Sequence, residues 1–227
     1  MRSIKNLPHY DEVVLTQSTK HGGFFNAHAH LDRAYTLSDM YLEHVGTTPM
    51  KASNLPLTVK QNLVGDLHLG PAYTPADLRK RMTFALERQL AFGVCRIDTN
   101  IDATPDLPEG GMLAVNIALQ LKRTFKKRGL DVRVAPTPIF GLKRGTKRWH
   151  VFKRAAGMCD YLSLLPEKDD YPKGGDPDER VGFKHHVRMG LELACALNKE
   201  AQFHVDQMNV PFEDGSERVL EVLESTF

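Results

Sequence analysis

Short apolar runs alternate along the chain with longer stretches in which apolar residues recur every three or four positions. One such stretch lies between Thr74-Pro75, a typical helix start, and Gly93, a typical helix stop. The compact apolar runs predict strands at 24–28, 94–98, 131–135, 161–165 and 201–205. Further helices are predicted at 111–128, 146–156, 179–198 and 216–224. This order predicts about five strand–helix units with a parallel sheet and right-handed crossovers.

The chain is long enough to bury one substantial core. It has 227 residues, of which 41% are hydrophobic and 26% charged, a composition that argues against disorder. We therefore expect one α/β domain over residues 1–227, of the barrel or the doubly wound type. The segment 33–73 interrupts the rhythm with several prolines and glycines, which predicts either a lid or short elements of its own.

Charge and cysteine usage exclude several classes of function. The net charge is +2, and the basic stretches 122–128 and 143–154 are predicted to be solvated helix faces, so no nucleic-acid partner is expected. Cys95, Cys159 and Cys195 have no paired spacing and are predicted to be buried thiols in a reducing compartment. No segment is apolar and long enough for a signal peptide or a membrane span, so a cytoplasmic location and no membrane contact are expected.

Histidines follow the first and the fifth predicted strands. His28 and His30 alternate along the first strand, so both side chains project from the same face. His204 ends the fifth strand, and in a parallel barrel the first and fifth strands open at the same mouth. Each motif alone fits histidines with ordinary local hydrogen bonds equally well. Together they predict a site where three imidazoles can share one divalent ion.

The residues around these histidines resemble a known family. The segments 26–32, 90–98, 157–161 and 203–207 are similar to the amidohydrolase superfamily, and within it to the cytosine deaminase-like branch. The resemblance implies a (β/α)₈ barrel whose divalent metal, zinc or iron, is bound by His28, His30 and His204 and activates water against a C–N bond of a small molecule. It also implies that the carboxylate of Asp32 helps to position the metal site without binding the metal itself.

The sequence departs from the branch in three places. Gln207 stands where the deaminases have a proton-shuttling glutamate, so it can donate a hydrogen bond but cannot exchange a proton near neutral pH. The segment 138–141 is apolar where the branch tends to have a substrate-reading glutamine. The sixth-strand histidine and eighth-strand aspartate have no counterpart. We therefore expect an incomplete barrel with open edges that associates with a second copy or a complementing chain.

Three functional hypotheses remain open from the sequence. The first is a metal-dependent hydrolase of amides or amidines, with nucleobase deamination as a variant. The second is a metal-binding or structural remnant without catalysis. The third is a doubly wound domain in which the histidines are incidental, although no glycine-rich phosphate loop follows a predicted strand. Arg96 and Asp98 share a strand face and either line the barrel interior or form a salt bridge.

Overall fold

Five parallel strands form the frame of the molecule. A computed structural model describes residues 9–139, 141–170, 180–207 and 210–226. The strands are β1 (Phe24–Ala29), β2 (Val94–Asp102), β3 (Asp131–Thr137), β4 (Leu162–Leu164) and β5 (Ala201–Phe203). Hydrogen bonds join them as a three-stranded sheet, β1-β2-β3, and a two-stranded sheet, β4-β5. All five predicted strands are present, and every described pairing is parallel.

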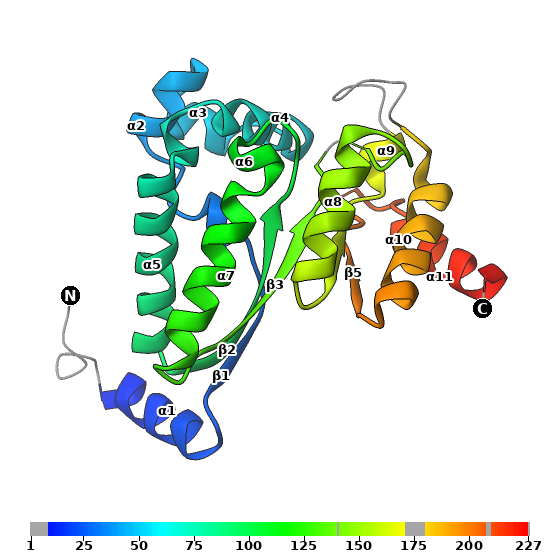
Figure 1. Cartoon of the computed structure of the whole chain (residues 1–227). Coiled ribbons are helices and arrows are strands. Elements are labelled where there is room, and N and C mark those ends of the chain that lie inside the picture. Colours follow the sequence, from blue (N-terminus) through cyan, green and yellow to red (C-terminus); the bar gives the residue numbers. More distant parts are fainter. Residues whose placement is uncertain (1–8, 140, 171–179, 208–209, 227) are drawn as a thin grey trace.

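Helices connect the strands and cover one side of them. The longer helices α5 (Pro75–Ala91), α7 (Leu113–Lys126) and α8 (Lys147–Met158) pack on β2 and β3, and α10 (Phe183–Leu197) packs on β4 and β5 (Figure 1). The remaining helices are α1 (His9–Lys20), α2 (Asp39–Leu42), α3 (Pro49–Ser53), α4 (Leu57–His68), α6 (Pro108–Gly111), α9 (Glu167–Asp170) and α11 (Gly215–Thr226). Single 3₁₀ turns lie at Leu31–Arg33, Glu43–Val45 and Pro71–Tyr73.

The predicted helix boundaries follow from capping chemistry. Thr74 caps α5, with its hydroxyl accepting from the backbone N–H of Asp77 at 3.3 Å, and Pro75 occupies the first helical position. Thr146 caps α8 in the same way, accepting from the N–H of Trp149 at 3.3 Å. Gly93 adopts a positive φ of 74°, which lets the chain turn from α5 directly into β2.

The core lies between the helices and the strands. Around β2 and β3 it contains Leu78 and Leu86 from α5 and Ile97 from β2, all fully buried. A second cluster joins Phe152 of α8 and Leu164 of β4 to α10. The apolar core thus lies along the length of the strands, and polar side chains can occupy the ends of the strands.

A seam separates the two sheets. The carboxylate of Asp160 accepts from the backbone N–H of Val134 at 2.8 Å, while the N–H of Asp160 donates to the carbonyl of Val134 at 2.8 Å. The side chain thus takes a place that a neighbouring strand would take in a continuous ladder. Further along, Thr137 donates to Ser163 at 3.0 Å between side chains. The expectation of one continuous five-stranded sheet is therefore wrong in this detail.

Two segments outside the strand–helix rhythm also have structure. Segment 33–73 contains α2, α3 and α4, which confirms that it has short elements of its own. Helix α1 precedes β1 and was not predicted, because its weakly amphipathic sequence gives little periodic signal. No helix among the described residues is both long and apolar enough to cross a bilayer.

The cysteines differ from one another in exposure, which corrects the prediction that all three are buried. Cys159 is buried, Cys95 is half-buried and Cys195 is exposed on α10. Burial, reinforced by the neighbouring Asp160 carboxylate, raises the pKa of the Cys159 thiol to about 12. Only the thiolate is nucleophilic, so Cys159 is inert in the folded chain at neutral pH.

We expect iodoacetamide at pH 8 to label Cys195 first and to leave Cys159 unlabelled until the chain unfolds. Peptide mass spectrometry with and without urea measures this order. If Cys159 were labelled as fast as Cys195 in the folded chain, Cys159 would not be buried before β4 as the structure has it.

Candidate metal centre

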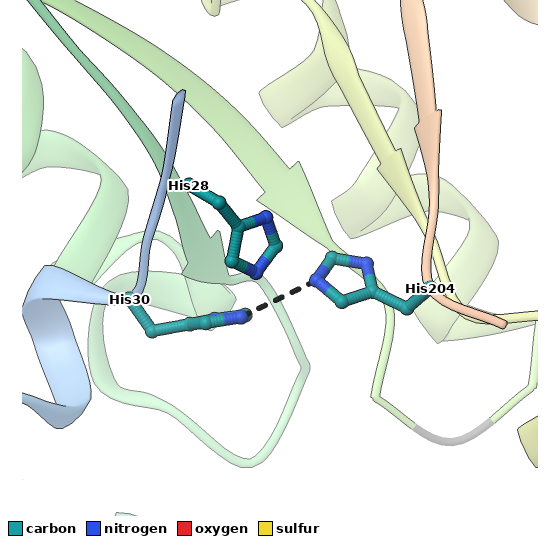
Figure 2. Close-up of side chains that lie close together, drawn as sticks. All are labelled: His28, His30 and His204. Carbon is teal, nitrogen blue, oxygen red and sulfur yellow. Dashed lines mark hydrogen bonds between the residues drawn. The ribbon is translucent and has the colours of Figure 1, made fainter. Parts of the chain in front are cut away.

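Three histidines converge where β1 and β5 end. His28 lies in β1, His30 directly follows this strand, and His204 directly follows β5. Figure 2 shows the three rings pointing toward one another. Each offers a nitrogen, and these nitrogens all lie within 4.8 Å of one another. The predicted convergence of residues about 175 positions apart is thus present in the fold.

The spacing of the rings suits a single ion. Nε2 of His30 and Nε2 of His204 are 3.3 Å apart. Two nitrogens bound to the same tetrahedral zinc ion are about 3.3–3.4 Å apart at ordinary zinc–nitrogen distances. The ring centroids lie 4.9–5.2 Å from one another, so the imidazoles meet at their edges and do not stack. His30 and His204 therefore have the spacing of two ligands of one small divalent cation, and His28 offers a third nitrogen within 4.8 Å of theirs.

Hydrogen bonds behind His204 fix which of its nitrogens faces the site. Nδ1 lies 3.4 Å from the carbonyl oxygen of Leu164 and 3.3 Å from the hydroxyl of Ser163. A carbonyl can only accept, so the proton of the neutral ring belongs on Nδ1. The lone pair of Nε2 then faces His30, which is the tautomer a metal ligand needs.

Asn100 of β2 is a site residue that the sequence did not single out. Its amide nitrogen lies 3.3 Å from Nδ1 of His28 and 3.5 Å from Nε2 of His204. Its oxygen accepts from the hydroxyl of Tyr161 at 3.0 Å, which holds the NH₂ group toward the histidines. Asn100 shares a strand face with Asp98 and Asp102, and this run of polar residues on a buried strand is the signal that could have identified it.

The histidines favour the neutral form. Burial, assisted by the positive charge of Arg33, lowers the pKa of His30 to about 2. Burial, and next the neighbouring His28, lowers the pKa of His204 to about 4. Burial also lowers the pKa of the more exposed His28. Because only an unprotonated imidazole nitrogen binds a metal, all three rings are in the ligand-competent state at neutral pH.

The histidines open into a cavity of about 340 Å³. Arg33, Lys168 and Gln207 share its wall, and the rest is contributed by Thr137, Ile139 and Leu165. None of these lining residues is acidic. Gln207 thus lines the same cavity as the histidines, whereas Asp32 is fully buried and does not line it.

A buried polar network lies behind the cavity wall. Asp102, at the end of β2, accepts from Arg33 Nε at 2.9 Å, contacts Nε2 of His68 at 3.1 Å and accepts from the Tyr73 hydroxyl at 3.2 Å. Asp32 lies 3.1 Å from the same hydroxyl, whose single proton the two carboxylates share, and accepts from the N–H of Asp102 at 2.9 Å. Both carboxylates are fully buried. The network fixes the guanidinium of Arg33 at the cavity edge.

The two carboxylates of this network differ in how readily they ionise. Burial opposes the ionisation of Asp102, but Arg33 and His68 hold its pKa well below its usual range. Burial, and next the charge of Asp102, raises the pKa of Asp32 to about 6. A single buried guanidinium thus supports one firmly charged carboxylate beside a second that ionises less readily.

Arg81 of α5 fastens the turn that follows β1. Its guanidinium donates to the carbonyl oxygens of Asp32 at 2.8 Å and Ala34 at 2.6 Å, and it also bonds to that of Ala72. Asp77 balances the charge at 2.6 Å. These bonds satisfy carbonyl groups that no helix or strand satisfies, and they set the backbone just after His30.

Arg96 and Asp98 form the salt bridge that was one of the two readings of the sequence. The guanidinium makes two contacts of 3.1 Å with the carboxylate and lies over the ring of Phe25, 4.5 Å from its centroid. Arg133 adds a third contact to Asp98 at 3.5 Å. The pair therefore ties β1, β2 and β3 together.

Comparisons with known proteins place the fold. No family model matches the chain. An uncharacterised protein of Haemophilus influenzae is 28% identical over 212 residues, covering 92% of this chain and 66% of the relative. The chain is similar to 5-methylcytosine deaminase from Klebsiella pneumoniae, crystallised with phosphonocytosine, with a TM-score of 0.62 and 18% identity. It is also similar to N-isopropylammelide isopropylaminohydrolase from Burkholderia multivorans, with a TM-score of 0.59 and 20% identity.

These similarities cover most of this chain but only part of the relatives. Each match to the two enzymes covers 89% of this chain and 44% of the enzyme chain. The strands, the helix layer and the parallel pairing agree with the α/β fold and the incomplete barrel that the sequence predicted. The chain has the fold of part of the barrel found in enzymes of the amidohydrolase superfamily.

Proposed function

We propose that this chain forms part of a metal-dependent hydrolase that cleaves a non-peptide C–N bond in a cyclic or linear amide or amidine. One observation carries the proposal. Three neutral histidines from β1 and β5 offer nitrogens within 4.8 Å of one another at the wall of a 340 Å³ cavity. The donor set suits zinc or iron, and the cavity is of a size that admits a small molecule.

The residues of the chain have distinct tasks in this proposal. His28, His30 and His204 would hold a divalent ion, which would supply the Lewis acidity that activates water for hydrolysis of the C–N bond. Ser163 and the Leu164 carbonyl hold His204 in the ligand tautomer. The buried network of Asp32 and Asp102 supports the backbone after His30 from behind the cavity, as a positioning device.

Gln207 lines the cavity and has no acidic proton to give. Its amide N–H is suited to stabilising an oxyanion that develops on the substrate carbonyl, a contribution worth about 3–4 kcal/mol per donor in comparable sites. Ring deamination of an aminopyrimidine needs a group that both takes and gives a proton, which a glutamine cannot do. The proposal therefore favours amide substrates over aminopyrimidines.

The test is turnover by the zinc- or iron-loaded chain on hydantoin, succinamide and cytosine, with wild type and Gln207→Glu assayed side by side. We expect wild type to hydrolyse an amide and leave cytosine unchanged, and the glutamate variant to lose about 100- to 1000-fold in amide turnover. The exposed Gln120→Glu is the matched control for the change in charge and should behave as wild type.

The outcomes separate the competing functions. Rapid cytosine deamination by wild type would overturn the amide preference and favour a nucleobase deaminase. Tight metal binding without turnover on any substrate would favour a non-catalytic metal-binding role. Absence of metal binding would reject the hydrolase and the metal-binding hypotheses together.

A further inference from the structure

Lys168 of α9 is a buried cation in the wall of the cavity. The residue is only 7% exposed, yet it lines the same space as His28, His30 and His204. Its backbone N–H donates to the Leu165 carbonyl at 3.1 Å, which fixes the turn that carries the side chain. A buried ammonium is costly unless an anion or several acceptors offset its lost hydration.

Within the described part of the chain, no carboxylate forms an ion pair with Lys168. The adjacent Glu167 accepts instead from the backbone N–H of Asp206 at 2.5 Å and faces a different pocket with Asp170. Asp169 is paired with His186 at 2.5 Å. The acids next to Lys168 on its own helix are therefore committed to other partners.

The rest of the cavity wall does not balance this charge. Arg33 is the other cation there, and its guanidinium is already neutralised by the fully buried Asp102. The histidines are neutral, and none of the described residues that line the cavity is acidic. Burial, and next the charge of Arg33, lowers the pKa of Lys168 to about 8, so the ammonium is still mostly protonated at pH 7. Among the described residues, Lys168 thus has no directly paired carboxylate, and only the charge of the adjacent Glu167 partly offsets its own.

We infer that Lys168 is an anion-binding group and that the substrate carries a carboxylate or phosphate in addition to the C–N bond that is cleaved. The assignment of the anion to a substrate rests on the proposed function, whereas the binding of an anion by Lys168 does not. A charged oxygen placed beside Lys168 restores the missing counter-charge, and the neighbouring Arg33 adds favourable potential. A neutral amide of the same size gains none of this.

The anion site is tested by calorimetric titration of the full chain with succinate, inorganic phosphate and the neutral succinamide. The titrations are made at pH 7 in zinc-free buffer, where no anion can bind through a metal. We expect succinate or phosphate to bind and succinamide not to bind. Lys168→Met should weaken the anion by about ten- to hundredfold, while Lys168→Arg should retain most of the affinity. The stronger of the two anions identifies the chemical source of the charge.

Two controls make the result decisive. Lys153→Met removes an exposed lysine of α8 and should leave anion binding unchanged. Near-ultraviolet circular dichroism and zinc titration show whether Lys168→Met is still folded. Equal anion affinity in wild type and folded Lys168→Met overturns the inference, as does equal binding of succinamide and succinate. If wild type does not bind zinc, the proposed function is refuted, but the result on anion binding is unaffected.

Discussion

Replacing His204 by alanine is expected to weaken zinc binding by more than about 100-fold. A catalytic zinc site typically has three protein ligands, and the variant leaves only His28 and His30, both on the β1 side of the cavity. Loss of a ligand should cost at least as much as the 10- to 100-fold loss found when a residue supporting a ligand is removed. Competition with a chromophoric chelator at pH 7.5 measures the affinity.

His150→Ala is the matched control, because His150 is exposed on α8 and far from the triad in sequence. It should bind zinc as wild type does. His28→Ala and His30→Ala should each fall with His204→Ala. If His204→Ala binds zinc as tightly as wild type, the three histidines are not the ligand set and the proposed hydrolase function falls with them.

Asp102→Asn is expected to destabilise the fold by about 3–5 kcal/mol. The substitution keeps the shape of the side chain but removes the fully buried negative charge that pairs with the half-buried Arg33 guanidinium. His68 and Tyr73 lose a charged acceptor at the same time. Urea unfolding at pH 7.5, followed by circular dichroism, measures the free energy of unfolding.

Asp106→Asn provides the comparison. Asp106 faces Arg148 at 3.4 Å, but 44% of its side chain is exposed, so the pair is screened by water. Its loss should cost under about 1 kcal/mol. Equal effects of the two substitutions would show that Asp102 does not hold a buried charge network together.

The strands could be predicted from local rules, and the meeting of the three histidines from the topology expected of parallel strands. Alternation along a strand puts His28 and His30 on one face, and parallel strands open at one end, which brings His204 to them. The helix caps at Thr74 and Thr146 follow from residues within three positions of each other. Strand alternation and helix caps can be predicted without knowing how the side chains pack.

Other features depend on contacts between residues that are distant in the sequence and that no local pattern predicts. Asp102 meets Arg33 across 69 positions and His68 across 34, and nothing in the local pattern around Asp102 predicts either. The seam at Asp160 likewise arises because a side chain meets the backbone of Val134, 26 positions away. Lys168 looks like an ordinary helix-surface lysine until the fold buries it.

The seam between β3 and β4 has a consequence for chain entropy. His28 and His30 belong to one sheet and His204 to the other, 174 residues from His30. Because a loop of that length must close before all three ligands can meet, an ion that binds the triad stabilises the state in which both sheets are folded together. Metal binding and the cohesion of the two sheets are then one equilibrium, so an ion that favours the triad also favours the assembled barrel wall.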